Sequence, residues 1–453
     1  MWKKNDSIRL TIEDLTTEGA GIGKVDGFTF FIKDALIGDE IDARVIKLKK
    51  NYGFARLMNI ITPSPDRVTP RCPVARSCGG CQIQAMRYDA QLAWKQEKVR
   101  QLLERVGHVS DYEMLPIMGM EEPWHYRNKV QYPVGLDKEG RIVTGFYAGR
   151  THAIIDTERC YIQPEINEQI LSVVKQWMAD EQILPYDENT GKGLVRHVLT
   201  RIGFQTGEIL VCLVINGQKL PHADPLISKL REIAGMKSIS VSPNMSRSNV
   251  ILGETSRTLW GQDYITDYIG NVKYQISPLS FYQVNPVQTR RLYQTALEFA
   301  DPGPQDVVWD LYCGIGTISL FIAQKASQVH GVEIVPQAIE DAKRNAALNG
   351  MSNAHFYVGK AEEVLPQAYR ENHIHADIIV VDPPRKGCDQ ALLDCMLKMQ
   401  PAKIVYVSCD PATLARDLRI LEEGGYKVKK VRCCDMFPHS IHCETVVLLT
   451  RNT

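Results

Sequence analysis

The chain has 453 residues, of which 44% are apolar and 23% are charged, and its 53 basic side chains balance its 53 acidic ones. This composition is that of a soluble globular protein, and the length suggests about three domains. Zero net charge argues against a protein that binds nucleic acid through bulk charge alone, although a local basic stripe is compatible with RNA. Because we find no apolar signal segment and no run long enough to span a bilayer, we expect a cytoplasmic protein without a membrane partner, and a monomer.

Residues 1–61 alternate short β-type runs with glycine-containing turns. The runs interpreted as strands are residues 8–12, 19–23, 28–32, 40–48 and 52–61. Short strands at this spacing predict a small β-barrel of the kind that commonly binds oligonucleotides. A basic stripe without an acidic residue runs through the last two strands: Arg44, Lys47, Lys49, Lys50 and Arg56. The proline-rich residues 62–70 are predicted to form a linker.

Three cysteines follow the linker with the spacing C-x5-C-x2-C: Cys72, Cys78 and Cys81. A disulfide framework is not expected in a long chain without a secretion signal. The compact set in a glycine-containing loop predicts a metal site, for which Cys160 is the best candidate as the fourth ligand. Four thiolates suit both zinc and an iron–sulfur cluster, and the spacing does not choose between them.

Residues 62–276 are interpreted as a central α/β domain, with a helix from about Tyr88 to Val106. From about residue 277, strand-like and helix-like segments alternate, which predicts parallel βα units in a third domain, residues 277–453. The expected parallel strands are residues 307–311, 329–334, 354–358, 377–382 and 403–409. Two further strands, residues 426–432 and 444–450, are too close together for a helical crossover and should pair antiparallel. The fold class is therefore a multidomain α/β protein with a doubly wound C-terminal sheet.

Three features of the third domain favour a nucleoside cofactor. Gly314 and Gly316 follow its first strand and allow the backbone to approach a ligand where a helix begins. Glu333 ends the second strand, where a carboxylate can accept hydrogen bonds from a ribose. Asp382 ends a central strand in V-V-D-P-P-R, at the sheet edge where open α/β sheets bind ligands. A structural turn or a helix cap explains each feature alone, but a cofactor site explains all three.

Cys409 is the cysteine whose position indicates reactivity. It ends the fifth strand, and Asp410 and Pro411 fit the cap and the first position of a following helix. The helix dipole should favour a thiolate and lower the pKa of this thiol below its reference value of about 8.5. Burial as a structural residue is the commoner fate of a cysteine, and we assign it to the others of this domain.

Glu444 opens the last strand in P-H-S-I-H-C-E-T. If that strand is antiparallel, Glu444 lies on the same sheet edge as Cys409 and Asp382. Alkylation of an unreactive aromatic carbon, such as carbon 5 of uracil, requires this set of groups. A thiolate adds at carbon 6, the resulting enolate attacks a sulfonium methyl group, and a base removes the proton from carbon 5.

Taken together, these motifs resemble the TRAM-containing RNA (uracil-5-)-methyltransferases, and the 23S ribosomal RNA members most closely. The likeness covers nearly the whole chain and rests most on S-C-x-P and P-H-x-x-H-x-E in this order. Residues 1–61 look like the TRAM domain, and residues 277–453 look like a class I methyltransferase domain. The resemblance implies S-adenosylmethionine as cofactor and 23S ribosomal RNA as partner. Asp410 departs from the asparagine that is frequent in the family, but both residues cap helices.

The resemblance also implies roles for individual residues. Cys409 matches the nucleophile and Glu444 the base, whereas Phe281 is similar to an aromatic residue at the flipped base. The positions that match cofactor contacts are Gln283, Tyr312, Glu333 and Asp382. The positions similar to the ligands of a [4Fe–4S] cluster are Cys72, Cys78, Cys81 and Cys160.

Three rival interpretations stay open. An amino-group RNA methyltransferase would use D-P-P-R but would not need Cys409 or Glu444. A non-catalytic RNA-binding factor would use the barrel and tolerate loss of Cys409. A uridine-5 methyltransferase acting on tRNA is the closest rival, but tRNA enzymes of the T-loop type generally lack the TRAM domain and the cysteine cluster. The sequence does not indicate which uridine is methylated, or how many.

Overall fold

The computed structural model describes residues 2–149, 151–157, 159–372 and 374–452, which form two compact units. The first unit comprises Met1–Lys98, Phe146–Ile155 and Phe437–His442. The second comprises Val99–Gly145, Asp156–Met436 and Cys443–Thr453. Helix α1 (Tyr88–Arg105) begins in the first unit and ends in the second.

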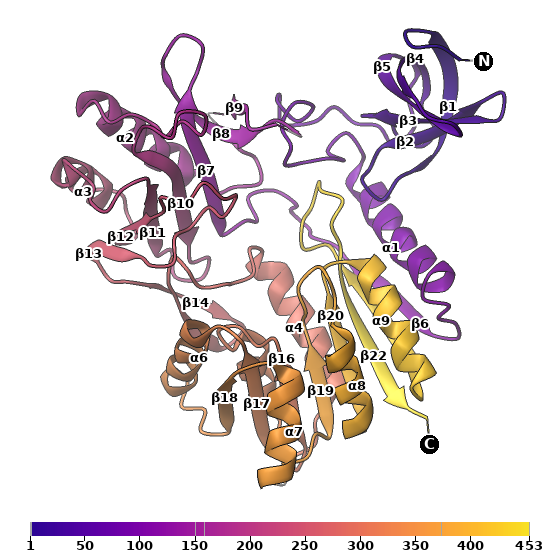
Figure 1. Cartoon of the computed structure of the whole chain (residues 1–453), viewed down its shortest axis with the longest axis vertical. Coiled ribbons are helices and arrows are strands. Elements are labelled where there is room, and N and C mark those ends of the chain that lie inside the picture. Colours follow the sequence, from indigo (N-terminus) through magenta and orange to yellow (C-terminus); the bar gives the residue numbers. More distant parts are fainter. Residues whose placement is uncertain (1, 150, 158, 373, 453) are drawn as a thin grey trace. The chain divides into compact units, whose positions relative to one another are not determined.

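A closed five-stranded barrel forms the N-terminal part of the first unit (Figure 1, indigo). Its order is β1-β2-β3-β5-β4, and β1 pairs with β4 to close it. The strands alternate buried and exposed residues, so one set of side chains fills the barrel and the other faces outward. The barrel predicted from the sequence is thus confirmed, with the strands β1 (Ser7–Leu15), β2 (Gly21–Val25), β3 (Phe28–Lys33), β4 (Glu40–Leu48) and β5 (Tyr52–Thr62).

A seven-stranded sheet of order β13-β12-β11-β10-β7-β8-β9 occupies one part of the second unit. Every residue of its inner strand β11 is buried, as expected for a strand covered on both faces. Helix α2 (Ile166–Asp180) packs against α3 (Ala223–Arg231), and α3 packs against β12. The strands are β7 (Lys129–Leu136), β8 (Ile142–Tyr147), β9 (Ile154–Asp156), β10 (Val195–Ile202), β11 (Ile209–Ile215), β12 (Met236–Pro243) and β13 (Arg257–Gly261).

An eight-stranded sheet of order β18-β17-β16-β19-β20-β22-β21-β6 forms the C-terminal part of the second unit. Strands β16 to β20 are parallel, whereas β22 is antiparallel to both β20 and β21, as predicted. The hairpin of β14 (Ile265–Ile269) and β15 (Val272–Ile276) precedes this sheet in the chain. The sheet strands are β6 (Glu113–Met118), β16 (Val307–Leu311), β17 (Gln328–Glu333), β18 (Ala354–Val358), β19 (Ile378–Val381), β20 (Lys403–Ser408), β21 (Tyr426–Cys434) and β22 (Glu444–Arg451).

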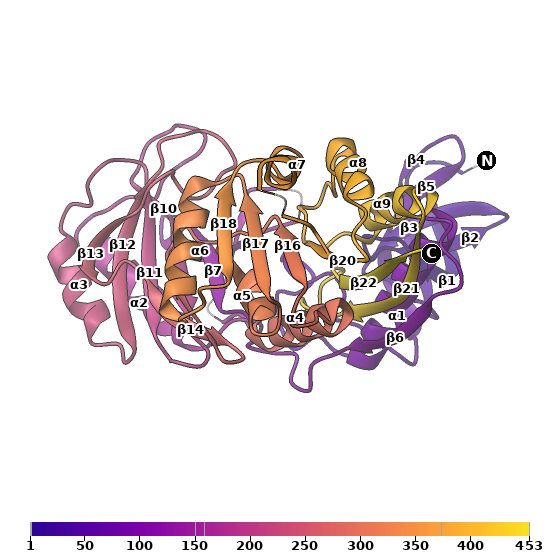
Figure 2. The same cartoon turned by 90° about the horizontal axis from the view of Figure 1, so that it is seen from below.

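Helices cover both faces of the eight-stranded sheet. Figure 2 shows α4 and α5 on one face and α7, α8 and α9 on the other. This is the doubly wound arrangement that alternating strands and helices predict, because each crossover returns over the sheet. The helices are α4 (Pro286–Ala300), α5 (Thr317–Ala323), α6 (Pro336–Leu348), α7 (Ala361–Asn372), α8 (Gln390–Met399) and α9 (Pro411–Glu423).

Strand β6 joins the sheet although the sequence did not indicate it. It pairs parallel with β21 at the edge of the sheet and carries Pro116. Proline is tolerated at an edge because it has no N–H to donate, but within a short run it argues against a strand. None of the described helices is long and apolar enough to cross a membrane.

Candidate active site

The predicted reacting residues converge on one edge of the eight-stranded sheet. Parallel strands β19 and β20 end immediately before Asp382 and Cys409, and antiparallel β22 begins at Glu444. Ser408 is the partner of Thr445 across β20 and β22, which places the following Cys409 beside the preceding Glu444. The antiparallel direction of the last strand therefore brings together residues that are far apart in the sequence.

Cys409 lies at the mouth of the sheet, partly exposed, directly before α9. Asp410 caps this helix as predicted, because its carboxylate accepts hydrogen bonds from the backbone N–H groups of Ala412 and Thr413. The expected lowering of the thiol pKa is wrong. Burial, followed by the negative charges of Glu444 and Asp382, raises the pKa of Cys409 to about 12, against a lowering influence of Arg385.

Glu444 is buried, with 2% of its surface exposed. Its Oε2 atom has no hydrogen-bond partner among the described residues. Burial and the negative charge of Asp382 raise the pKa of this carboxyl well above its usual value. A raised pKa makes the carboxylate a stronger base, which suits a group that must remove a proton from carbon near neutral pH.

Arg385 acts electrostatically on two of the predicted reacting residues, and the sequence analysis did not single it out. Its charge lowers the pKa values of both Cys409 and Glu444, which places the guanidinium near the reacting groups. The only signal in the sequence was its position in D-P-P-R. Helix α9 holds the loop that carries it, because the Thr413 hydroxyl donates to the Arg385 carbonyl at 3.1 Å.

A buried carboxylate strengthens this attachment. Asp417 on α9 accepts hydrogen bonds from the Cys388 N–H at 2.8 Å and from the Tyr406 hydroxyl at 2.6 Å. Arg416 pairs with Asp417 and donates to the Lys386 carbonyl. The loop with Asp382 and the helix that follows Cys409 are therefore held as one structural element.

The loop after β16 has the geometry expected of a cofactor site. Gly314 has a φ of +55°, and a Cβ atom placed on it would meet open space, so a ligand can approach its backbone. Tyr312 also has a positive φ, +70°, and is partly buried. Glu333 ends β17, and one of its carboxylate oxygens accepts a hydrogen bond from the Val335 N–H at 3.0 Å. These residues fit a nucleoside with its ribose at Glu333.

Two acidic residues of neighbouring strands have raised pKa values: Asp310 lies in β16, and Asp382 directly follows β19. Burial raises the pKa of Asp310 to about 7, and a hydrogen bond of 2.5 Å from the Ser319 hydroxyl opposes this shift. Burial and the charge of Asp310 raise the pKa of Asp382 to about 7. The second carboxylate oxygen of Asp310 is buried without a partner among the described residues. A cationic ligand at this edge would stabilise both ionised carboxylates.

The segment before α4 carries the two remaining predicted site residues. Phe281 has 69% of its surface exposed, whereas Gln283 is buried. Asn128 donates from its side chain to the Gln283 carbonyl at 2.9 Å, and the buried Arg201 donates to the Ser280 carbonyl. The segment is thus held firmly while the Phe281 ring stays available for stacking. No sequence pattern indicated Asn128 and Arg201, because these contacts join distant parts of the chain.

The basic segment around Lys129 lies next to these contacts. Burial, then the charges of Arg201 and Arg127, lower the pKa of Lys129 to about 7. The groups that act on Lys129 are both cations, so a nearby anion would raise its pKa again.

The predicted metal ligands are divided between the units: Cys72, Cys78 and Cys81 belong to the first and Cys160 to the second. All four thiols are partly exposed, whereas most other cysteines are buried. Cys72 and Cys78 interact, since the negative charge of Cys72 adds to burial in raising the pKa of Cys78. Across the described residues, however, no group of three or more cysteine, histidine or acidic side chains could hold a metal ion. The four thiols are suitable ligands for a metal cluster, but the described part of the chain does not bring them together as a metal site.

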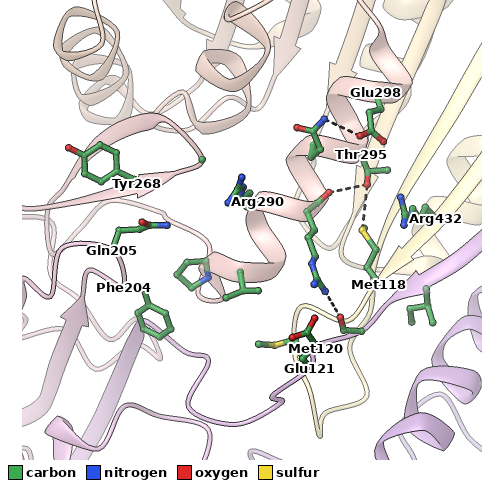
Figure 3. Close-up of a pocket in the computed structure, with 17 residues that line it drawn as sticks. Met118, Met120, Glu121, Phe204, Gln205, Tyr268, Arg290, Thr295, Glu298 and Arg432 are labelled. Atoms are coloured by element: carbon green, nitrogen blue, oxygen red, sulfur yellow. Dashed lines mark hydrogen bonds between the residues drawn. The ribbon is translucent and has the colours of Figure 1, made fainter.

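A cavity of about 1030 Å³ lies along α4 (Figure 3). Figure 3 shows Arg290 and Glu298 on this helix, with Phe204 and Gln205 on the loop that faces it. None of the predicted site residues lines this cavity. The predicted active-site residues therefore lie at the sheet edge and not in this cavity.

Comparison with known proteins agrees with this geometry. The family profile described as tRNA (Uracil-5-)-methyltransferase matches residues 87–452, and the TRAM domain profile matches residues 2–58. A protein of Halalkalibacterium halodurans named an uncharacterized RNA methyltransferase is 54% identical over 447 residues, which is 98% of this chain and 97% of that protein. A Clostridium tetani protein named in the same way is 51% identical over 449 residues, covering 99% of this chain and 97% of its own.

A solved structure is similar over almost the whole chain. It is the Pyrococcus abyssi tRNA (uracil-54, C5)-methyltransferase in complex with S-adenosyl-L-homocysteine, with a TM-score of 0.80 and 28% identity. The match covers 98% of this chain and 100% of that one, so it includes the N-terminal barrel. The expectation that tRNA enzymes of the T-loop type generally lack this barrel does not hold for the Pyrococcus abyssi enzyme.

Proposed function

The chain belongs to the tRNA (uracil-5-)-methyltransferase family and carries a TRAM domain, and from this premise we propose that it methylates carbon 5 of a uridine in 23S ribosomal RNA. It is an RNA methyltransferase of the uracil-5 class that uses S-adenosylmethionine. The observation that supports the carbon-5 chemistry is the meeting of Cys409, Glu444 and Asp382 at one sheet edge. The choice of ribosomal RNA is supported by the cysteine set Cys72, Cys78, Cys81 and Cys160, which tRNA enzymes of the T-loop type generally lack. An amino-group methyltransferase would need neither Cys409 nor Glu444.

The proposed mechanism assigns one step to each reacting residue. The Cys409 thiolate forms a bond to carbon 6 of the uracil, and the electron pair of the double bond moves to the oxygen on carbon 4 as an enolate. When bound, the cofactor would supply a methyl group on a sulfonium: carbon 5 of the enolate would bond to this methyl group as the methyl–sulfur bond breaks, which leaves a neutral thioether. Glu444 then removes the proton from carbon 5, the double bond reforms, and the bond between sulfur and carbon 6 breaks.

The raised pKa of Cys409 indicates when the thiolate forms. Burial, followed by the negative charges of Glu444 and Asp382, raises the pKa of this thiol and so favours its protonated form in the protein alone. Arg385, and the positive charge of a bound sulfonium, would each favour the thiolate. We propose that the nucleophile is activated only once the site is filled, which protects the thiol from other reactions.

Phe281 is proposed to hold the target base. Extrusion of a stacked base costs a few kcal/mol. Stacking on an aromatic ring typically stabilises a bound base by about 1–3 kcal/mol. The exposed ring of Phe281 and its firmly held backbone suit this role. Gln283, Tyr312, Glu333 and Asp382 are proposed to contact the cofactor.

A uridine in tRNA is the second candidate substrate. The Pyrococcus abyssi enzyme, whose name states that it acts on tRNA uracil 54, supports this alternative because the two chains match over their full length. The barrel therefore does not separate the two substrates by itself.

We expect the full-length protein to methylate 23S ribosomal RNA transcripts at least tenfold faster than tRNA transcripts, a difference of about 1.4 kcal/mol in transition-state binding. Transfer of a radioactive methyl group, with nuclease digestion to locate 5-methyluridine, measures this ratio. A higher rate on tRNA would show that tRNA, the second candidate, is the preferred substrate. A labelled adenine or guanine would exclude both.

We also propose that a [4Fe–4S] cluster is bound by Cys72, Cys78, Cys81 and Cys160, with zinc as the alternative. All four thiols are partly exposed, as ligands to an added group would be in its absence. The cluster has no place in the proposed methyl transfer.

Protein purified without oxygen should contain about four iron atoms and four acid-labile sulfides per chain and should absorb visible light. Cys72→Ser should lose most of the iron, whereas Cys395→Ser, which alters a buried thiol elsewhere, should retain it. Metal analysis of both variants and the wild type provides the measurement. A colourless protein with stoichiometric zinc would replace iron by zinc in this proposal.

A further inference from the structure

The loop that follows β19 carries a residue that acts on the nucleophile without being anchored by its own side chain. This residue is Arg385, whose positive charge lowers the pKa of the Cys409 thiol. The Arg385 side chain is exposed and forms no hydrogen bond or ion pair with the residues that the structure describes. The position of its guanidinium therefore depends on how the backbone of the loop is held.

A threonine hydroxyl joins the backbone of this loop to the chain at the nucleophile. The Thr413 hydroxyl oxygen lies 3.1 Å from the Arg385 carbonyl oxygen and 3.2 Å from the Asp410 carbonyl oxygen. Both carbonyl groups are thus within hydrogen-bond reach of one side chain. Because Asp410 directly follows Cys409, the loop and the nucleophile approach each other at the first turn of α9.

Arg416 on α9 holds the next part of the loop. Its guanidinium donates hydrogen bonds to the carbonyl oxygens of Lys386 and Cys388, each at 3.0 Å. An ion pair with Asp417, at 2.6 Å, orients the guanidinium for both contacts. Asp417 is itself fixed, since it is fully buried and accepts a hydrogen bond from the Cys388 N–H at 2.8 Å. A guanidinium can make all these bonds at once because its donors point in several fixed directions.

Gly387 shows how closely the loop lies on α9. Its φ of +76° lies in the left-handed region that favours glycine. A Cβ atom placed on it would lie 2.6 Å from atoms of both Arg416 and Asp417. The glycine therefore leaves the space in which Arg416 reaches the carbonyl groups on either side of it.

We propose that Arg416 is a positioning residue of the reaction: it holds the loop so that the Arg385 guanidinium stays beside Cys409. Arg416 does not touch the reacting atoms and acts through Arg385. This inference rests on the proposed function and deepens it, because that function assigns the nucleophile to Cys409.

The charges around the thiol explain why the position of one cation matters. The charged groups that act on Cys409 are Glu444 at the start of β22, Asp382 directly after β19, Asp410 before α9, and Arg385. Three of these four groups are acidic and disfavour the thiolate. Displacement of the single cation of this set would leave their effect unopposed.

The test measures how fast iodoacetamide alkylates Cys409 in the full-length protein at about pH 8.5, near the reference pKa of a thiol. Mass spectrometry of the peptide that carries Cys409 gives the rate. Only the thiolate reacts, so the rate falls about tenfold for each unit by which the pKa rises. Arg385→Gln should slow alkylation at least about tenfold, because a nearby opposite charge lowers a thiol pKa by about one unit or more. Arg416→Gln should slow it about threefold, since Arg385 stays in the chain but is held less closely to the thiol.

The double variant Arg385→Gln/Arg416→Gln separates positioning from a general loosening of the loop. If Arg416 acts through Arg385, the double variant should react at the same rate as Arg385→Gln. Arg419→Gln is the matched control, because it removes an exposed arginine of the same helix that pairs with Glu423, and it should react as the wild type does. Equal slowing by Arg416→Gln in both backgrounds, or faster alkylation of Arg416→Gln, would overturn the proposal.

Thr413→Val is the second variant, for use if Arg416→Gln lowers the melting temperature. It keeps the branched shape of the side chain but removes the hydroxyl that reaches the Arg385 carbonyl. Alkylation of Cys409 should slow about twofold in this variant, and this slowing should disappear when Arg385 is already glutamine.

The outcomes separate this inference from the proposed function. If the wild type methylates uridine while Arg416→Gln and Thr413→Val are alkylated as fast as the wild type, Arg416 has no positioning role and the proposed function stands. If alkylation slows as expected but no uridine is methylated, the proposed function fails, and the effect of Arg416 on Cys409 stands.

Discussion

Replacement of Cys409 by alanine should abolish methyl transfer, with a rate reduced at least about 1000-fold. Without the thiolate, carbon 5 of uracil is never converted to the enolate carbon, and the neighbouring thiols of Cys313 and Cys443 are buried. A 1000-fold loss corresponds to about 4 kcal/mol in the barrier, since each factor of ten is about 1.4 kcal/mol. Radioactive methyl transfer to RNA under saturating cofactor measures it.

A covalent trap gives a second readout for Cys409. In RNA that contains 5-fluorouridine, fluorine replaces the proton that the base must remove, so the adduct cannot break down. The wild type should become permanently attached to such RNA and migrate more slowly on a denaturing gel. Cys409→Ala should form no adduct, whereas Cys395→Ala, which alters a buried thiol of α8, should form it as the wild type does. Normal turnover by Cys409→Ala would refute the mechanism.

The place of Cys409 could be predicted from the sequence, but its acidity could not. A strand-like run, an aspartate cap and a proline are local features, and they located the thiol at the mouth of the sheet before α9. Its pKa depends most on burial, and then on Glu444 at the start of β22 and Asp382 directly after β19. A helix dipole acts within one turn and is the smaller effect where two carboxylates face the same thiol.

The same distinction explains the rest of the site. Glu333, Asp382 and Glu444 stand at strand ends, and the alternation of strands and helices was enough to bring those ends to one edge. Asn128 and Arg201, by contrast, act through backbone carbonyls that are distant in sequence, and such contacts leave no local pattern. Strand β6 was not predicted for a third reason. Pro116 lies within this short run, and a proline inside a run argues against a strand unless the strand is at an edge.

Replacement of Glu444 by glutamine should stop the reaction after methylation and not before it. Glutamine fills nearly the same volume but cannot accept the proton from carbon 5. The thiolate therefore stays bonded to carbon 6 of a base that already carries the methyl group. We expect a stable covalent complex of protein and methylated RNA, with turnover reduced at least about 1000-fold, or about 4 kcal/mol.

The physical reason lies in the environment of Glu444. Burial and Asp382 raise its pKa, so its carboxylate is a stronger base than an exposed glutamate. As the pH falls through this raised pKa, Glu444 becomes protonated and removal of the proton from carbon 5 slows. The wild-type turnover rate should therefore fall at low pH. In Glu444→Gln, the rate of adduct formation should not show the fall at low pH that is due to Glu444, because this titrating carboxyl is absent.

Denaturing gels with radioactive methyl groups distinguish this result from simple inactivation. Glu444→Gln should carry the label on the covalent complex, at close to one RNA per protein, whereas the double variant Cys409→Ala/Glu444→Gln should carry none. Multiple turnovers by Glu444→Gln would mean that another group, with Asp382 the nearest candidate, removes the proton. An unlabelled complex would mean that Glu444 acts before methyl transfer, and its assignment as the final base would be wrong.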